Sequence, residues 1–384
     1  MLLRSSQQRR RGQSPHVPQT GIARDALGRL IVDQVSLRDF RSYARFELEL
    51  KPGLVLVVGP NGAGKTNLLE SLHVGTQGFS PRTRNDAALI RFGHEGARIA
   101  LHGDRAGTPL DLSVVLRVGT AKRASLNGAR LQTAEELRTE VATLVFTPDR
   151  LVVVKGGPAA RRAYFDRALG RGTPTRSALP AEYGAALAQR NASLRGITLG
   201  YSSREALRPW TERVADLGAQ LVEARRDVIA ALAPLFAGRA AELGLSDAAL
   251  RYEATAPSVD SLEARLDRDI DRGATGAGPH LDDVEIFAGR RELRVFGSQG
   301  EQRLAVLALL LAEAEVVRER RGVPPLLLLD DVLSELDPDR RRVLAGQLSS
   351  YGQALITTTS ATALPVEPDQ LVEVEGGKAG TVLR

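Results

Sequence analysis

The segment GPNGAGKT, residues 59–66, constrains this chain more than any other feature of its sequence. It follows the continuous apolar run LVLVV (54–58), which is typical of a strand buried on both faces, and it precedes the pattern of a short helix (65–75). Glycines at this spacing let backbone N–H groups surround phosphate oxygens, and a helix start adds partial positive charge. The strand–loop–helix context therefore predicts a loop that binds nucleotide phosphates.

Each residue type in this loop has a chemical role. Lys65 is predicted to contact the β and γ phosphates of ATP, and the Thr66 hydroxyl is predicted to bind Mg²⁺. The predicted nucleotide-binding residues of the loop are Gly59, Pro60, Asn61, Gly62, Ala63, Gly64, Lys65 and Thr66.

A second segment, LLLLDD (326–331), carries two carboxylates. The four leucines predict a buried strand, and the carboxylates follow at its C-terminal end, where ligands bind in open α/β sheets. Asp330 is predicted to hold the Mg²⁺ ion or its water shell. Asp331 is predicted to orient or deprotonate an attacking water, and Lys65 completes the predicted catalytic pair. Alone, two aspartates after a strand could equally be a helix-capping turn.

A third segment, FGSQGEQR (296–303), directly precedes a predicted long helix (300–321). Ser298, Gly300 and the first helical turn would form a second site for an anion. If this segment belongs to a separate lobe, it cannot easily reach the γ-phosphate at its own loop, and a second copy of the chain could supply it. The simpler alternative is a glycine-containing helix cap.

Composition limits the classes of protein that this chain can be. It contains no cysteine, which excludes a disulfide framework or thiolate metal site and fits a reducing compartment. No run of 18 apolar residues is present, so no membrane span is predicted. The net charge is +6, but five arginines and no acids fall in residues 1–24, which leaves +1 for the rest. Charge alone therefore does not indicate nucleic-acid binding.

The chain divides into four predicted regions. Residues 1–24 are interpreted as a disordered basic tail, or as the product of a misassigned start. Residues 25–175 and 276–384 form the two halves of a β-rich head, and residues 176–275 form a helical arm between them.

Apolar residues from Leu207 to Leu235 are spaced alternately by three and four, which is a heptad seam. Pro209 suits the start of this helix, and Pro234 is predicted to kink its end. A helix near 180–195 would pack back on it; an ordinary buried helix pair is the alternative.

Several shorter patterns complete the prediction. Strands are predicted at 30–37 and 44–51, a meander follows with a hairpin at Asn127-Gly128, and VATLVF (141–146) is predicted to close that lobe. Further predicted elements are a helix from Pro158 to about Leu169, a hairpin turning near Gly289, a helix at 338–348 and a strand at 354–359.

The order of these motifs resembles the ABC-type ATPase heads of the SMC and RecF group. Within that group, further segments resemble the RecF family: VSLRDFRSY (35–43), GGPAARRAYFD (156–166), GPHLDD (278–283) and LLLLDDVLSELDPDRR (326–341). The resemblance implies an α/β fold, with mixed β-sheets around the phosphate-binding loop and a short helical arm inserted into the head. It also implies that Ser298, Gln299, Gly300 and Glu301 form the signature motif, and that Ser334 to Asp337 form the D-loop, in which Asp337 approaches the nucleotide.

The resemblance further implies a function in recombinational DNA repair, replication and the SOS response. ATP and Mg²⁺ would drive a homodimer that clamps double-stranded DNA near single-strand gaps and hydrolyses ATP slowly in a DNA-dependent manner. RecR and RecO would be its partners in loading a RecA-type recombinase. Such a protein would be cytoplasmic and nucleoid-associated, with no membrane partner.

Two departures from the pattern of the group affect the site. Asp331 stands where a glutamate is usual, which predicts slow hydrolysis because the carboxylate is held one methylene further back. No histidine follows His280, so the switch histidine is missing, and Thr357, Thr358 or Thr359 is the candidate to replace it. Gln77 is the candidate Q-loop residue; a solvated loop amide is the alternative.

The predicted DNA contacts are basic residues that precede hairpins or helices. Aromatic residues are only 4% of the chain, which argues against base stacking and favours contacts to a duplex backbone. For each candidate an ion-paired or solvated side chain is the alternative, and Arg161 and Arg162 could instead brace the head. His280 could be a structural histidine. The candidates are Arg82, Arg84, Lys122, Arg123, Arg161 and Arg162.

Three other functions compete with this interpretation. The first is an SMC-like ATPase head with a structural role in chromosomes, which the short predicted arm disfavours. The second is the nucleotide-binding subunit of a transporter, which the long insertion and the missing histidine disfavour. The third is a nucleotide-gated binding module with negligible turnover.

Overall fold

The strand that precedes the phosphate-binding loop lies inside a six-stranded sheet of order β15-β14-β3-β13-β12-β8 in the computed structural model, which describes residues 30–376 and 378–382. The predicted tail at 1–24 lies outside these residues. All strands except β15 run parallel. Their bounds are β3 (Gly53–Val58), β8 (Thr143–Phe146), β12 (Leu326–Leu329), β13 (Gln353–Thr358), β14 (Gln370–Glu375) and β15 (Lys378–Val382).

Hydrophobic cores cover both faces of this sheet. Along β12, Leu327 and Leu329 belong to the core on the helical side, whereas Leu326 and Leu328 belong to the core that faces the second sheet. Residues of β3 alternate in the same way. Burial on both faces explains why the sequences of both strands are continuous apolar runs. Because the strands run parallel, the C-terminal ends of β3 and β12 lie at one edge of the sheet.

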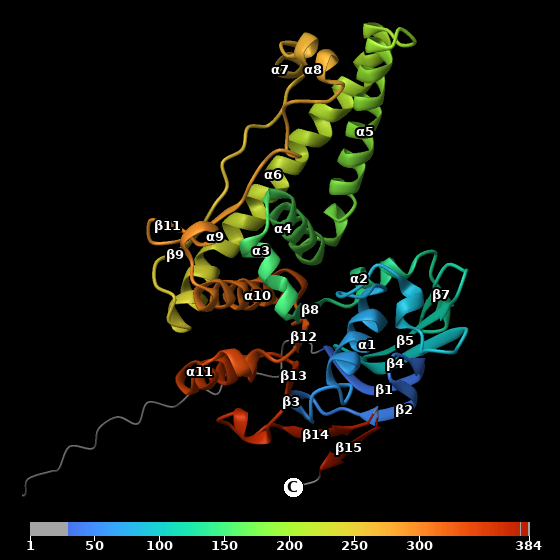
Figure 1. Ribbon diagram of the computed structural model, residues 1–384, viewed down its shortest axis with the longest axis vertical. Helices are drawn as coiled ribbons and strands as arrows, with labels where there is room; N and C mark the ends of the chain where they lie inside the picture. Colours follow the sequence, from blue (N-terminus) through green and yellow to red (C-terminus); the bar gives the residue numbers. More distant parts are fainter. Residues whose placement is uncertain (1–29, 377, 383–384) are drawn as a thin grey trace, which may run out of the picture.

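The second sheet is antiparallel, with the order β2-β1-β4-β5-β6-β7. Helix α1 (Lys65–Gln77) packs between the two sheets, against β4 and β5 on one side and β8, β12 and β13 on the other (Figure 1). The strands are β1 (Leu30–Phe40), β2 (Tyr43–Glu49), β4 (Gly96–Arg105), β5 (Thr108–Arg117), β6 (Arg123–Leu126) and β7 (Ala129–Arg130). The predicted strands at 30–37 and 44–51 and the predicted meander are confirmed.

The segment 141–146 does not close the antiparallel lobe as predicted. Its strand, β8, pairs in parallel with β12 and so becomes the edge of the nucleotide-loop sheet. All four residues of β8 are buried, because α10 (Gln299–Arg321) and α1 pack against it. An apolar strand can be recognised from sequence, but its pairing partner lies far along the chain.

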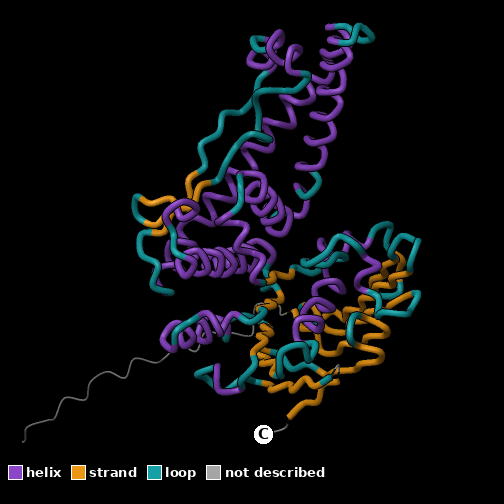
Figure 2. The backbone as a smooth tube through the Cα atoms, viewed as in Figure 1, coloured by secondary structure: helices purple, strands orange, loops and turns teal. Residues whose placement is uncertain are grey.

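A helical part stands beside the sheets and extends into an arm, drawn in purple in Figure 2. Helix α5 (Leu179–Thr198) packs along α6 (Arg204–Glu242), and α4 (Pro158–Gly172) and α10 (Gln299–Arg321) pack at the base of α6. The predicted seam is buried from Val214 to Val228, whereas Trp210 is partly exposed. Both Pro209 and Pro234 lie inside α6. The helix starts five residues before Pro209, contrary to the predicted start, and continues eight residues beyond Pro234.

The remaining elements connect these parts. A three-stranded sheet of order β11-β10-β9 lies near the base of the arm and contains the predicted hairpin around Gly289. Two short helices, α7 and α8, cover the far end of the arm (Figure 1). The bounds are α2 (Leu137–Glu140), α3 (Val152–Lys155), β9 (Ala248–Arg251), α7 (Val259–Glu263), α8 (Leu266–Arg272), β10 (Glu285–Ala288), β11 (Arg291–Glu292), α9 (Leu293–Phe296), α11 (Pro338–Leu348) and the 3₁₀ turns η1 (Asp86–Leu89), η2 (Ala134–Glu136), η3 (Pro148–Leu151), η4 (Pro174–Arg176), η5 (Val332–Glu335) and η6 (Ala361–Ala363).

Candidate functional site

The phosphate-binding loop leaves β3 and enters α1 through left-handed backbone. The φ angle is +80° at Gly62 and +115° at Gly64, a region in which a side chain is strained. At Gly59, a Cβ atom would lie 2.2 Å from the carbonyl oxygen of Val374. The path of the loop therefore favours glycine at all three positions.

Lys65 closes the loop with its own side chain. Its Nζ donates to the carbonyl oxygens of Gly59 at 2.7 Å and Pro60 at 2.9 Å. Burial lowers the pKa of Lys65, while the nearby carboxylates of Asp331 and Asp330 oppose that change. The ammonium group is therefore held where the loop curves, close to the end of β12.

Asp330 lies at the C-terminal end of β12 and faces α1. The Thr66 hydroxyl donates to it, with Oγ1 3.0 Å from each carboxylate oxygen, and the Thr357 hydroxyl donates to Oδ1 at 2.7 Å. The carboxylate of Asp330 is largely buried, at 8% exposure for the residue. The two predicted metal ligands are thus within hydrogen-bond distance, and they offer the oxygen donors that Mg²⁺ prefers.

Asp331 has a different environment from its neighbour. Its backbone adopts a left-handed conformation with φ of +50°, and the residue is exposed. Its backbone N–H donates to Thr357 Oγ1 at 2.9 Å. The turn therefore directs the side chains of Asp330 and Asp331 to different surroundings, one buried beside Thr66 and one open to water.

The candidates for the switch and Q-loop positions have different outcomes. Thr357 is buried and is joined to both aspartates, as described above, whereas Thr359 is exposed. Gln77 lies at the last position of α1, far along the helix from the loop, and its Nε2 donates to the carbonyl oxygens of Val141 at 2.7 Å and Thr76 at 3.0 Å. The Q-loop assignment of Gln77 is therefore wrong, since this buried amide satisfies backbone groups. The solvated-amide alternative fails as well.

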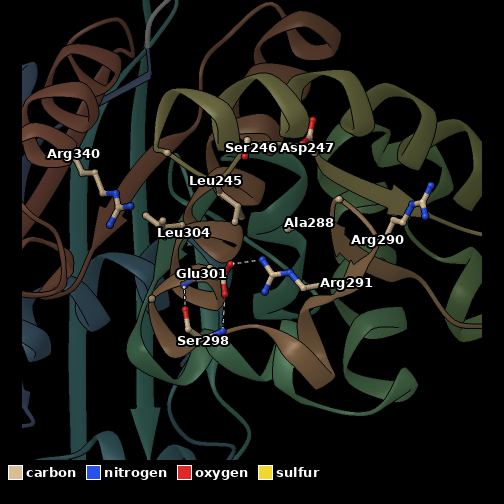
Figure 3. A pocket seen from close by; sticks show the side chains of 13 residues that line it. Leu245, Ser246, Asp247, Ala288, Arg290, Arg291, Ser298, Glu301, Leu304 and Arg340 are labelled. Carbon is tan, nitrogen blue, oxygen red and sulfur yellow. Dashed lines mark hydrogen bonds and ion pairs between the residues drawn. The ribbon is translucent and has the colours of Figure 1, made fainter.

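The signature segment lies in the helical part of the molecule, at the start of α10. A pocket of about 430 Å³ opens there, and Figure 3 shows its lining side chains. They come from the turn after α6, the β10–β11 hairpin, α10 and α11; among the described residues that line it, none belongs to the phosphate-binding loop. Ser298 Oγ accepts from the backbone N–H of Glu301 at 3.2 Å, and Glu301 Oε2 accepts from the N–H of Ser298 at 2.8 Å. This capping box fixes the first turn of α10.

The predicted D-loop links the two aspartates to α11. The Ser334 hydroxyl donates to the carbonyl oxygen of Asp331 at 2.9 Å. Asp337 caps α11 by accepting from the N–H of Arg340 at 2.9 Å, and it also pairs with the Arg340 guanidinium at 3.2 Å. Arg340 in turn lines the pocket at the signature segment, so the D-loop and that pocket share a structural element.

Arg161 does not fit its predicted DNA contact. Its side chain is 1% exposed and makes a two-pronged ion pair with Asp283, at 2.7 Å and 2.6 Å. Arg162 is half-buried and donates to the carbonyl oxygen of Asp282 at 2.6 Å. The alternative that Arg161 and Arg162 brace the head agrees with this arrangement. The segments GGPAARRAYFD and GPHLDD therefore meet in the fold, although they are distant in sequence.

His280 belongs to the same structural network. Its Nδ1 lies 2.7 Å from the Tyr183 hydroxyl and its Nε2 3.0 Å from the carbonyl oxygen of Thr275. Burial lowers the pKa of His280. The ring therefore joins the arm to the head as a neutral group.

The other predicted DNA residues lie on the antiparallel lobe and the segment that follows α1. Arg84 and Arg123 are exposed, and the Lys122 ammonium lies 3.5 Å from the Asp86 carboxylate. Arg82 is about two-fifths exposed and pairs with Glu70 at 3.2 Å.

Sequence reasoning missed a second pocket, of about 550 Å³, that Arg82 lines beside the start of α1. Arg41 lines it too, and its guanidinium makes two 2.9 Å contacts with the buried Glu70 carboxylate. Asn67, which follows Thr66, donates to Ser42 Oγ at 3.0 Å, so the pocket adjoins the phosphate-binding loop. Arg41 and Ser42 stand in the segment VSLRDFRSY, which was the one available signal.

Comparison with known proteins places this arrangement in a family. A family model described as the RecF/RecN/SMC N terminal domain matches residues 31–382. A protein of Heliobacterium modesticaldum named DNA replication and repair protein RecF is 36% identical over 365 residues, which cover 91% of this chain and 96% of the relative. A relative of the same name from Anaeromyxobacter dehalogenans is 40% identical over 344 residues, covering 84% and 91%. The chain belongs to the RecF family.

Solved structures agree with the RecF-family assignment. One described as the recombination mediator protein RecF-ATP in the RecFOR pathway is 27% identical, with a TM-score of 0.84, and covers 94% of this chain and 99% of that chain. The Smc head domain of Pyrococcus furiosus matches with a TM-score of 0.56 at 18% identity, a likeness of fold alone. The expected ABC-type head with an inserted helical arm is thus confirmed. Over residues 30–376 and 378–382, no helix has both the length and the apolar character to cross a membrane.

Proposed function

We propose that this RecF-family protein binds ATP with Mg²⁺, forms an ATP-dependent homodimer and clamps double-stranded DNA near single-strand gaps. ATP hydrolysis to ADP and phosphate would reopen the dimer. The family assignment and the likeness to a structure described as RecF-ATP support ATP binding and ATPase activity.

The side chains at the end of β12 fit a magnesium ion. Thr66 and Asp330 supply a hydroxyl and a carboxylate at one point, and Lys65 supplies positive charge beside them. When bound, Mg²⁺ neutralises charge on the phosphates of ATP. Residues Gly59 to Thr66 would hold those phosphates, with Lys65 leaving its loop carbonyls to contact them.

The proposed dimer is supported by one observation: the phosphate-binding loop and the start of α10, the two proposed anion sites, lie apart in the fold. The phosphate-binding loop begins α1 on one side of the sheet, whereas Ser298, Gln299, Gly300 and Glu301 begin α10 in the helical part, at a pocket that the loop does not line. A nucleotide held by one copy would therefore be capped by the α10 start of a second copy, with Asp337 of the D-loop close by.

Slow hydrolysis follows from the position of Asp331. Its exposed carboxylate stands beside the Lys65 region and would orient or deprotonate the attacking water. Aspartate is one methylene shorter than the glutamate usual in this group, so the carboxylate is set further back from the nucleotide. DNA binding to the closed dimer would increase turnover.

Exposed basic side chains provide the proposed DNA contacts. Arg84 and Arg123 are open to solvent, and Arg82 and Lys122 are partly accessible. Contacts to the phosphate backbone would make binding fall steeply with salt. By family, RecR and RecO would be the partners in loading a RecA-type recombinase, and the protein would act in the cytoplasm at the nucleoid.

The dimensions of the arm favour this function over a structural SMC role. Helix α6 has 39 residues, roughly 58 Å at 1.5 Å per residue. A rod several hundred ångströms long, as an SMC arm requires, would be visible in solution scattering. A binding module with negligible turnover would be favoured if Asp331→Asn left phosphate release unchanged.

Fluorescence anisotropy of a labelled gapped duplex tests the proposal. The full chain is titrated in ATP, in ADP and without nucleotide, beside the Ser298→Arg variant, whose long side chain would block the α10 start. Tighter binding in ATP alone, lost in the variant, supports the clamp. Weak binding that is indifferent to nucleotide would remove DNA as the direct ligand.

A further inference from the structure

The carboxylate of Glu301 lies in the first turn of α10, where the nucleotide bound to a second copy of the chain would dock. Glu301 Oε2 accepts from the N–H of Ser298 at 2.8 Å, and Glu301 Oε1 lies 2.8 Å from Nη2 of Arg291. Figure 3 shows the Glu301 carboxylate between the Arg291 guanidinium and the backbone N–H of Ser298. Glu301 is therefore an anion placed at a site proposed to receive another anion.

The α10 start still has donors for an incoming phosphate. The backbone N–H groups of Gln299 and Gly300 occupy the first positions of the helix, which have no partner within it. The Ser298 hydroxyl, whose Oγ accepts from the backbone N–H of Glu301, stands at the same end of the helix. At Gly300 a Cβ would meet only Ser298 Oγ, at 4.0 Å, so the approach is open.

The charge of Glu301 would oppose a phosphate at these donors. Hydrogen bonds from Arg291 and Ser298 hold the pKa of Glu301 at about 2, so its carboxylate is ionised at neutral pH. Two negative charges a few ångströms apart at a protein surface repel strongly unless a cation lies beside them. Arg340 also lines this pocket, but its guanidinium is paired with Asp337 rather than with Glu301.

We propose that Arg291 is a positioning residue that neutralises Glu301, so that the start of α10 can accept the polyphosphate of a nucleotide bound to a second copy of the chain. The inference rests on the proposed ATP-dependent dimer. Arg291 stands on β11, directly after the turn at Gly289, and its Nη1 also lies 3.4 Å from the carbonyl oxygen of Phe296. The β10–β11 hairpin thus places the Arg291 guanidinium beside Glu301.

Four variants of the full chain separate this role from a structural one. Arg291→Ala removes the cation, and Glu301→Gln removes the anion while keeping a side chain that can complete the capping box. The double variant Arg291→Ala/Glu301→Gln tests whether Arg291 acts by neutralising the charge of Glu301. Arg290→Ala is the matched control, because the adjacent guanidinium points away from Glu301 (Figure 3).

Dimerisation is measured by sedimentation with Mg²⁺ and the non-hydrolysable analogue AMP-PNP. Arg291→Ala should raise the protein concentration for half-dimerisation roughly tenfold, because an uncompensated charge then faces the phosphate. Glu301→Gln and the double variant should dimerise within about twofold of each other, because no charge remains to neutralise. Arg290→Ala should match the wild type. Binding of labelled AMP-PNP to monomers at low concentration, and thermal unfolding, should be unchanged in all of them.

Each outcome decides a different point. If the wild type does not dimerise with AMP-PNP, the ATP-driven dimer is wrong, and the inference fails with it. If the wild type dimerises and Arg291→Ala does so equally well, only the role of Arg291 is overturned. If Arg291→Ala is weak and the double variant stays as weak, Arg291 does not act through the charge of Glu301, which also overturns the inference.

Discussion

Thr66 and Asp330 are 264 positions apart in the chain, yet the Thr66 hydroxyl oxygen lies 3.0 Å from both carboxylate oxygens of Asp330. The contact arises because β3 and β12 run parallel with β13 between them, so their C-terminal ends share one edge of the sheet. The Thr66 hydroxyl at the start of α1 and the Asp330 carboxylate after β12 thus face each other beside Lys65. A cation held there would depend on the charge of Asp330 more than on its size.

The Asp330→Asn variant tests that dependence. The amide keeps the size of the side chain but removes the charge that would hold Mg²⁺, which is worth several kcal/mol of transition-state stabilisation. We expect ATP hydrolysis to fall at least about 100-fold. Phosphate release measured against Mg²⁺ concentration checks this. Asp339→Asn, at a side chain 90% exposed on α11, is the control and should keep the wild-type rate. Wild-type turnover of Asp330→Asn would rule out Asp330 as the ligand.

Thr357 should support this site through its hydroxyl alone. It donates to Asp330 at 2.7 Å and accepts from the N–H of Asp331 at 2.9 Å. Thr357→Val keeps the shape but leaves both groups without that partner, so we expect the free energy of unfolding to fall by about 1–3 kcal/mol. Apparent Mg²⁺ affinity should fall about 10- to 100-fold.

Thr357→Ser keeps the hydroxyl and is the matched control for both measurements. Chemical denaturation and Mg²⁺-dependent phosphate release in Thr357→Ser should stay close to the wild type. If valine and serine behaved alike, the hydroxyl would have no part in holding Asp330.

The chemistry of the loop and of β12 could be read from sequence because both signals are local. A continuous apolar run ending in Asp330 identifies a buried strand and the end at which its ligands lie. The same reasoning could not place 141–146, since four buried residues reveal a strand without revealing that β12 is its neighbour.

Polar residues were harder to assign because their partners are distant in sequence. Arg161 looked like a surface cation, but its partner Asp283 lies 122 positions away. Gln77 looked like a loop amide near the nucleotide, but the carbonyl oxygen of Val141 accepts from it inside the core. Burial and pairing of this kind depend on tertiary packing, which local patterns do not encode.

The arm contains a buried ion pair whose removal should be costly. Arg190 and Asp269 are both essentially inaccessible, with Nη1 and Oδ2 3.0 Å apart, and Thr275 accepts a second bond from Nη1 at 2.7 Å. Asp269→Ala leaves a buried guanidinium without its counter-charge, so we expect the free energy of unfolding to fall by about 3–5 kcal/mol. Urea denaturation followed by the fluorescence of Trp210, the one tryptophan of the chain, reports on the arm directly.

An exposed pair two positions away provides the comparison. Asp267 is 81% exposed and pairs with Arg204, so Asp267→Ala should change the free energy of unfolding by less than about 1 kcal/mol. If the two substitutions lowered the free energy of unfolding equally, burial of the ion pair would not determine the size of the loss.

His73 should make the fold sensitive to mild acid. It is 2% exposed on α1, and its Nδ1 lies 2.9 Å from the carbonyl oxygen of Phe79. The pKa of His73 is lowered to about 3, mainly by burial; the hydrogen bond to Phe79 opposes this change, and the positive charges of Arg150, Arg171 and Arg138 add to it. The folded protein therefore keeps His73 neutral at pH values where the unfolded chain binds a proton.

The sign of the pH effect follows from that difference. Because the unfolded histidine takes up a proton below its ordinary pKa of 6.5, the stability present above that pH is lost as the pH falls toward 3. We expect a loss of about 2 kcal/mol between pH 7.5 and pH 5. In His73→Gln this slope should be smaller by that amount, whatever the stability of the variant at pH 7.5. Denaturation at both pH values decides the matter, and an unchanged slope in His73→Gln would show that folding does not lower the pKa of His73.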